Sequence, residues 1–284
     1  MQIFGVSEAS FYCQAFTQEL GDAELSISTF KRAHIPRSTI IKEGTPLFQE
    51  YRACSLRNVE RSLFFAVSHY RRCLDCLLSS SSPWAQVTMY YGSFFAAKSL
   101  LGMFGCTIFD HHVVDVRRSF PSKQELQVRR IGNRVGEVRT TYTGSHRKFW
   151  DLFYRTVIPL RPLVGPSLSY ALVPIANNPV WQIEQRNAVN YDMYSALQSA
   201  HHFKQAFSSS TFPSSLPGPI GTQYGLLEAL IQIAFIFANQ FSLITDGLSP
   251  LATSGTRGKI INTLVYSEKA PRVLSKTKKR RLTK

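Results

Sequence analysis

The sequence predicts a mainly α protein, a helical bundle that carries a small antiparallel β insertion. Two observations predict the bundle: apolar residues recur at every third or fourth position over residues 47 to 78, and residues 84 to 104 are apolar on nearly every side. The insertion is predicted by short β-branched runs, separated by Gly, Asn and Pro, between residues 107 and 142. At 284 residues and 44% hydrophobic composition, the chain is long enough to bury a sizeable core.

Composition and chain-breaking residues divide the sequence into three parts. Residues 1–46 form an N-terminal segment, and residues 47–250 form the helical bundle domain with the β insertion at about 107–142. Residues 251–284 are predicted to be a short peripheral element followed by a basic, flexible tail. The bundle domain is therefore where a functional site is expected.

The helices at the start of the bundle follow from the spacing of apolar residues. Residues 24–30 alternate polar and apolar side chains, as a strand would, before a long amphipathic helix is predicted from Leu47 to Leu78. Ser82-Pro83 supplies a cap and a first-turn proline for the next helix, residues 84–104. Gly92 and two alanines allow another helix to approach closely, which predicts that this helix is central to the bundle.

Three short strands are predicted in the insertion, at residues 107–116, 125–131 and 135–142. The insertion is basic, and arginines such as Arg129 and Arg130 are placed between valine, isoleucine and tyrosine residues. This pattern indicates a surface that faces nucleic acid, with an ordinary solvated sheet face as the alternative.

Further helices are predicted at residues 144–154, 193–207 and 224–244. Ser145 is the natural cap of the first of these, and residues 159–166 are a proline-rich connector of low regularity. The Ser-, Pro- and Gly-rich residues 208–221 predict a mobile loop. Polar residues interrupt the apolar run of the last helix, which favours a buried core helix over a membrane span.

The formal charge of the chain is +15, and it is concentrated at the C-terminus. Residues 269–284 hold eight Lys and Arg and no acidic residue, so the rest of the chain retains +7. The run Lys278, Lys279, Arg280 and Arg281 is typical of a solvated, mobile end. It also favours polyanion binding, because clustered cations gain affinity for nucleic acid by counterion release.

Cysteine usage and the common motifs indicate neither a metal nor a cofactor. The five cysteines make an odd count without a secreted disulfide framework, which indicates reduced thiols in a cytoplasmic protein. Cys73 and Cys76 have the spacing of half a zinc site, but no second pair of ligands follows. No Gly-rich phosphate loop and no HExxH motif occurs, and the N-terminus does not have the pattern of a signal peptide.

A dense polar cluster marks the best candidate for a site. Asn178 is a suitable helix cap before Pro179, and the helix that follows carries Arg186, Asn187 and Asn190 on one stripe. A guanidinium beside two carboxamides suits a phosphate backbone and a buried polar network equally well.

Residues 89–101 (Met-Tyr-Tyr-Gly-Ser-Phe-Phe-Ala-Ala-Lys-Ser-Leu-Leu) and residues 186–191 (Arg-Asn-Ala-Val-Asn-Tyr) resemble the HEPN superfamily. The likeness covers residues 47–105 and 179–244, with the predicted strands as an insertion. It implies a helical bundle that commonly dimerises and, in many members, a metal-independent ribonuclease built on an Arg-x4-6-His motif. Arg186-Asn187 matches the first half of that motif. In such an enzyme the His assists proton transfer at the ribose 2′-hydroxyl, and the Arg stabilises the charged phosphorane.

The sequence departs from this motif at its histidine. Tyr191 lies at the first position of the expected spacing, and Asp192 and Met193 follow it. A tyrosine with an ordinary pKa near 10 is a poor proton acceptor at neutral pH. Arg186 and Tyr191 are therefore the candidate catalytic residues, with the proton-transfer half of the motif missing from the sequence.

No other histidine in the sequence is identified by its spacing as the missing histidine of the motif. Arg139 and His146 fit the motif formally, but Arg139 is predicted in a strand and a glycine intervenes, so we interpret the match as a coincidence. His201 and its neighbour lie about three helical turns beyond Arg186 at ~1.5 Å per residue. His69 lies on the first long helix and is interpreted as a core or edge residue.

These observations predict a HEPN-like protein of a bacterial defence or toxin-type system that binds RNA or a partner protein, as a homodimer or in a complex and away from membranes. One alternative is a metal-independent endoribonuclease that uses Arg186, and the other is a purely structural adaptor subunit. The residues predicted to contact nucleic acid are Arg186, Asn187, Asn190, Arg129, Arg130, Lys278, Lys279, Arg280 and Arg281.

Overall fold

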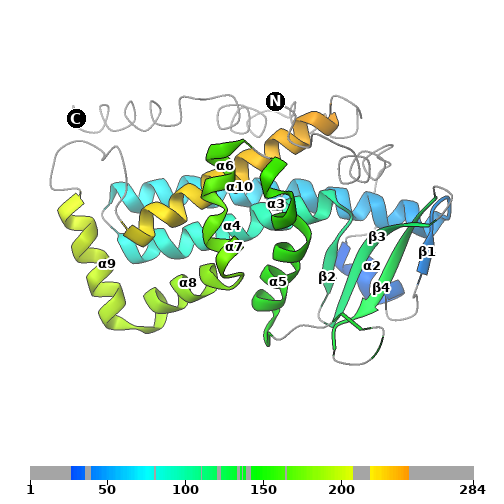
Figure 1. Cartoon of the computed structure of the whole chain (residues 1–284), viewed down its shortest axis with the longest axis horizontal. Coiled ribbons are helices and arrows are strands. Elements are labelled where there is room, and N and C mark those ends of the chain that lie inside the picture. Colours follow the sequence, from blue (N-terminus) through cyan, green and yellow to red (C-terminus); the bar gives the residue numbers. More distant parts are fainter. Residues whose placement is uncertain are drawn as a thin grey trace.

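A computed structural model describes most of the chain between residues 27 and 242. The described residues are 27–35, 40–79, 81–109, 111–119, 123–132, 135, 137–138, 142–163, 165–206 and 218–242. The fold is mainly α-helical with a small four-stranded antiparallel sheet, as the sequence predicts. Figure 1 shows the sheet at one end of an elongated helical body.

Three long helices form the body: α3 (Pro46–Leu78), α4 (Ser82–Met103) and α10 (Gly218–Ser242). They run side by side along the long axis of the molecule (Figure 1). The Thr45 side chain caps α3 by accepting a hydrogen bond from the Phe48 N–H, which satisfies a backbone donor that has no partner within the helix. The buried residues of α4 face both neighbouring helices, and α4 is therefore the central helix, as predicted.

Two glycines let α4 approach its neighbours. A Cβ atom on Gly102 would lie 2.5 Å from Cγ2 of Val59 on α3, and one on Gly92 would lie 2.8 Å from Cδ1 of Leu227 on α10. Real Cβ atoms do not approach carbon atoms so closely, because interiors are packed to van der Waals contact. The absence of side chains at these two positions therefore sets the spacing of the three helices.

The sheet has the order β1–β4–β3–β2, and every pair is antiparallel. The strands are β1 (Ile40–Lys42), β2 (Thr107–Phe109), β3 (His112–Ser119) and β4 (Lys123–Arg130). Helix α2 (Ile27–His34) packs Phe30 against the sheet and against the start of α3 in a small second core. Tyr51 of α3 donates a hydrogen bond to the Gly105 carbonyl, 3.0 Å away, and so links this core to the end of α4.

Two segments predicted as strands differ in the described structure. Residues 27–30 belong to helix α2 instead of a strand, because Ile27 and Phe30 are also spaced three residues apart and Phe30 packs into the core as one helical face would. Of the strand predicted at 135–142, the described residues form only the isolated bridge between Val138 and Ile131. The edge next to β4 is occupied by β1, so a distant segment supplies the missing strand.

The remaining helices follow the sheet in the chain, and α5, α8 and α9 among them pack against α4. They are α5 (Ser145–Val157), the 3-10 helix η2 (Ile158–Leu163), α6 (Pro166–Ala171), α7 (Val173–Asn177), α8 (Trp181–Tyr191) and α9 (Met193–Ala206). The connector predicted at 159–166 is thus largely helical. Most of the mobile loop predicted at 208–221, and all of residues 251–284, lie outside the described residues.

Candidate functional site

Side chains from three helices meet beside the middle of α4. Tyr90 lies on α4, His146 in the first turn of α5 and Arg186 on α8, and both α5 and α8 pack against α4. The guanidinium carbon of Arg186 lies 4.8 Å from the Tyr90 ring centroid, and Tyr90 Oη lies 2.6 Å from Nδ1 of His146. A tyrosine therefore connects an arginine and a histidine that are far apart in the sequence.

Tyr90 is the buried centre of this cluster. Its side chain is fully buried, and burial raises the pKa of its phenol to about 12, although the positive charge of Arg186 acts in the opposite direction. The hydroxyl is therefore protonated at neutral pH, and it has two ways to bond to His146: it donates to Nδ1, or it accepts from Nδ1–H. The second arrangement leaves Nε2 of a neutral imidazole as a free proton acceptor.

The entry into α5 positions His146. The cap of this helix is Gly144, in place of the predicted Ser145, and its φ of 84° lies in the left-handed region that favours glycine. The turn places half-buried His146 at the start of the helix, where Phe94 packs against it with ring centroids 4.7 Å apart. Burial lowers the pKa of His146 from its ordinary value of 6.5, and the charge of Arg186 lowers it further. His146 is therefore neutral at physiological pH.

Arg186 is held by two neighbours. Its Nη2 and Nε atoms donate to Oδ1 of Asn187, at 2.7 Å and 3.2 Å, while the guanidinium lies against the Tyr90 ring. Both contacts favour one orientation of the planar group, and cation–π contact of this kind is stabilising when partly desolvated. The side chain remains half-buried, so a solvent-borne anion has access to the guanidinium.

The helix that presents Arg186 begins slightly later than predicted. Helix α8 starts at Trp181 with Val180 as its cap, and Asn178 lies outside it. The Asn178 side chain still supports the start of the helix, because its Oδ1 accepts from the Val180 N–H and its Nδ2 donates to Glu184. The buried face of α8, with Ile183 fully packed in the core, then directs Arg186 toward α4.

The other predicted site residues lie apart from this cluster. Asn190 is exposed, and Tyr191 is 81% exposed at the end of α8. Arg129 and Arg130 lie on β4, in the sheet at the far end of the molecule (Figure 1). Lys278, Lys279, Arg280 and Arg281 lie outside the described residues. Arg186 and Asn187 are thus the predicted residues that the structure places together.

Sequence spacing missed His146 and Tyr90 as site residues. The spacing of Arg139 and His146 drew attention to this histidine. Arg139 lies outside the described residues, and the structure brings Arg186 near His146. Both residues reach the cluster through contacts between helices, which no local motif encodes. The one local signal was Gly144 before a predicted helix start, because it marks a turn that fixes where the next side chain points.

The described residues provide no cluster of three or more His, Cys, Asp or Glu side chains that would hold a metal ion. Cys73 is buried and Cys76 is half-buried, both as free thiols. Among the helices that the structure describes, none is both long and apolar enough to cross a membrane.

The chain matches no protein-family model, and no curated protein or solved structure is significantly similar to it.

Proposed function

We propose that this protein binds RNA and cleaves it without a metal ion, with His146 and Arg186 as the catalytic pair. The observation that carries the proposal is a neutral, half-buried histidine and a half-buried arginine that both contact Tyr90. Proton transfer and stabilisation of a pentavalent phosphate are the two tasks of this reaction, and these two side chain types perform them.

The chemistry follows from the free atoms of the two side chains. Nε2 of His146 takes the proton of a ribose 2′-hydroxyl while Nδ1–H donates to Tyr90. The 2′ oxygen then forms a bond to the adjacent phosphorus, and the bond from phosphorus to the 5′ oxygen of the next nucleotide breaks. The 5′ oxygen leaves with a proton from water, and the products are a 2′,3′-cyclic phosphate and a 5′-hydroxyl. Arg186 donates hydrogen bonds to the non-bridging oxygens as their charge increases.

The resemblance to the HEPN superfamily supports the same reaction. In this chain the arginine comes from residues 186–191, as that resemblance implies, but the histidine comes from the start of another helix. Tyr191 is not needed in this scheme. A role in a bacterial defence or toxin-type system rests on the resemblance alone, and is part of the proposal on that basis.

A second candidate function is a structural adaptor in which Arg186 only joins α8 to α4. One observation favours it: the guanidinium already has a carboxamide and an aromatic ring as partners. In this case the Arg186→Ala variant would unfold at a lower temperature or lose a protein partner, and RNA would play no part.

The test uses the full chain and two RNA substrates, single-stranded RNA and total tRNA, in buffer that contains EDTA. We expect cleavage by the wild type and a loss of about a hundredfold or more in both His146→Ala and Arg186→Ala. General acid–base groups and donors to a developing negative charge each typically contribute this much. A substrate with 2′-deoxyribose at the cleaved position should resist, because the attacking oxygen is missing.

His201→Ala is the matched control, because it removes an exposed histidine on α9. If the wild type neither cleaves RNA nor binds it in a salt-sensitive manner, the proposed function is wrong. If Arg186→Ala retains cleavage but has a lower melting temperature, the adaptor candidate replaces it.

A further inference from the structure

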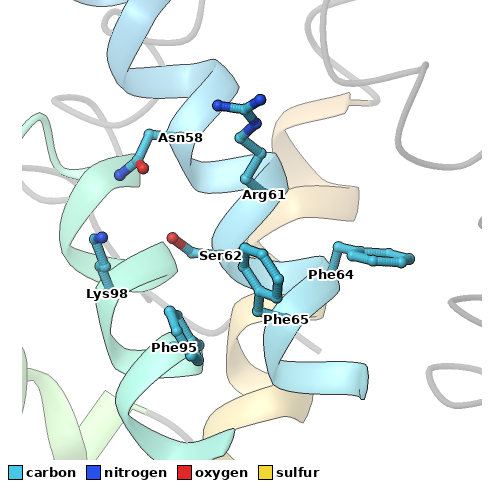
Figure 2. A pocket seen from close by; sticks show the side chains of 7 residues that line it. All are labelled: Asn58, Arg61, Ser62, Phe64, Phe65, Phe95 and Lys98. Atoms are coloured by element: carbon cyan, nitrogen blue, oxygen red, sulfur yellow. The ribbon is translucent and has the colours of Figure 1, made fainter. Parts of the chain in front are cut away.

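An open cavity of about 400 Å³ lies between α3 and α4. Figure 2 shows that its walls differ in character. Phe65 and Phe95 form an aromatic wall, while Asn58, Ser62 and Lys98 direct polar groups into the other end, and Arg61 lies above them. The cavity thus has an aromatic end and a polar, basic end.

The aromatic end is accessible to a ligand. Phe65 is 47% exposed although it is a large apolar side chain, and its ring is 5.2 Å from that of Phe95 by centroid. Phe64 lies beside it, 37% exposed. An accessible ring backed by a second ring provides a stacking platform for a planar group, and any of the four bases has a suitable face.

The polar end carries positive charge without a compensating acid. Within the described part of the chain, neither Arg61 nor Lys98 forms an ion pair, and no described acidic side chain lines the cavity. Burial lowers the pKa of Lys98, because the ammonium is partly removed from water. A negatively charged partner would offset this desolvation, so the cavity is complementary to an anion.

A series of packed aromatic side chains links the wall of the cavity to the site at Tyr90. The ring of Phe94 lies 5.6 Å from that of Phe95 and 4.7 Å from that of His146, by centroids. A second route runs through His69, which stacks on Phe95 at 5.5 Å and on Tyr91 at 5.9 Å, and Tyr91 meets His146 edge-on. Aromatic contacts therefore join Phe95 in the cavity wall to His146 by two routes.

We propose that this cavity is a nucleotide subsite for single-stranded RNA, in which a base stacks on Phe65 and a backbone phosphate binds Lys98 and Arg61. The inference rests on the proposed function, because it extends the same RNA from the catalytic pair onto α3. The combination of stacking surface and uncompensated cations fits an unpaired nucleotide, whose base and phosphate lie on opposite sides of the sugar. A second copy of this chain would cover the phenylalanines but would also bury the two cations without partners.

Binding is measured by fluorescence anisotropy with a labelled 2′-O-methyl uridine decamer, which cannot undergo transphosphorylation. We expect Phe65→Ala to weaken binding about tenfold, within the range for the loss of one base–aromatic contact. Phe65→Trp, which keeps a ring, should bind as the wild type does. Lys98→Gln should reduce the slope of log Kd against log salt concentration by about 0.7, which corresponds to one phosphate contact on a single strand.

Two controls match these variants. Tyr170→Ala removes an exposed aromatic side chain on α6, and Arg71→Gln removes an exposed cation on α3 outside the cavity. A decamer that carries 4-thiouridine should crosslink on irradiation to the tryptic peptide of residues 62–71, which contains Phe64 and Phe65.

The outcomes separate this inference from the proposed function. If the wild type binds RNA and both Phe65→Ala and Lys98→Gln bind equally well, the subsite is wrong and the catalytic pair is unaffected. If the wild type does not bind the decamer but still cleaves RNA at His146, the subsite is also wrong. If sedimentation velocity shows a dimer that Phe65→Ala dissociates without a change in affinity for RNA, the cavity is a contact between copies. If the wild type neither binds nor cleaves RNA, the proposed function fails and the inference fails with it.

Discussion

The hydrogen bond of 2.6 Å between Tyr90 Oη and His146 Nδ1 joins the central helix α4 to the first turn of α5. Arg186 from α8 lies against the same tyrosine ring. Tyr90 therefore determines the orientation of both residues of the proposed catalytic pair, although its own phenol stays protonated at neutral pH because burial raises its pKa to about 12.

Replacement of Tyr90 by Phe should impair cleavage without unfolding the protein. The ring and its contact with Arg186 remain. The variant lacks the hydroxyl that accepts from Nδ1–H of His146 in the proposed mechanism, so the tautomer with a free Nε2 is no longer favoured. We expect kcat to fall about tenfold, less than the loss of roughly a hundredfold or more for deletion of a proton-transfer group. Single-turnover cleavage measures this effect, and KM should change little.

The neighbouring substitution Tyr91→Phe is the control, because Tyr91 meets the His146 ring edge-on without a hydrogen bond to it among the described residues. Equal cleavage rates for Tyr90→Phe and the wild type would show that the hydrogen bond does not position His146.

Stability should decrease as the pH falls below about 6.5, because two histidines are kept neutral by the fold. Burial is the larger cause that lowers the pKa of both His69 and His146, and the charges of Arg72 and Arg186, respectively, add to it. The unfolded chain takes up protons near pH 6.5, before the folded chain does, so the free energy of unfolding falls with pH from that point toward the lower folded pKa values. Urea unfolding between pH 7.5 and 5.0 measures this slope.

The double variant His69→Gln, His146→Gln should show a shallower slope over the same range. A slope that is identical in the double variant would assign the acid sensitivity to carboxyl groups instead.

The sequence predicted the elements that depend on local spacing. Residues 47–78 have the period of a helix and lie in α3. Ser82 and Pro83 begin α4, and its cap is Ser81 instead of the predicted Ser82. The sheet was predicted as a unit, but its membership was not, because β1 is far away in the chain and pairs with β4 only through the tertiary fold. The short segment 24–30 fits the alternation of a strand and also the three-residue spacing of a helix. Burial of Phe30 in the core favours the helix.

The candidate site was only half predictable for a similar reason. Arg186 and Asn187 are adjacent, so their association was visible in the sequence. His146 comes near Arg186 because of a glycine turn before α5 and because α5 and α8 both pack against α4. No spacing of residues in the sequence predicts these contacts. The cavity beside Phe65 was not anticipated, because exposure of an apolar residue on an amphipathic helix cannot be read from its period alone.

Gly102→Ala should destabilise the protein, since its Cβ would overlap with Val59 Cγ2 at the crossing of α3 and α4. Helix propensity alone would favour alanine by about 1 kcal/mol. We expect overlap to outweigh this preference and to lower the free energy of unfolding by about 1–3 kcal/mol, as overpacked cores do. Chemical denaturation measures the change.

A smaller residue on α3 should relieve the overlap. In the double variant Val59→Ala, Gly102→Ala the loss should be smaller than the sum of the two single losses, because the new methyl group occupies space that Val59 vacates. Gly225→Ala is the control: it is a helical glycine of α10 whose Cβ would have no neighbour within 4 Å, so this variant should be as stable as the wild type or more so. Strict additivity of the two single losses would show that the two positions do not share a packing constraint.

A polar network between α3 and α10 should be a second place where a single substitution lowers the stability of the bundle. Tyr70 Oη donates to Oε1 of Glu228 at 2.7 Å and lies 2.8 Å from Tyr224 Oη, with both phenols largely removed from water. Burial raises the pKa of both tyrosines well above 10, so they act as neutral partners of the glutamate at physiological pH.

Tyr70→Phe removes the donor to Glu228 and leaves a partly buried carboxylate without it, which should lower the free energy of unfolding by about 1–3 kcal/mol. Tyr70→Phe combined with Glu228→Gln should lose less than the two single variants together, because the second substitution removes the charge that the first leaves without a partner. Tyr170→Phe, at an exposed position on α6, controls for the loss of a hydroxyl.

Cleavage of RNA by the folded fraction should be unchanged in all of these variants, since the network packs α3 against α10 and not against α5 or α8. A loss of cleavage at full folding would instead couple this network to the pair at Tyr90.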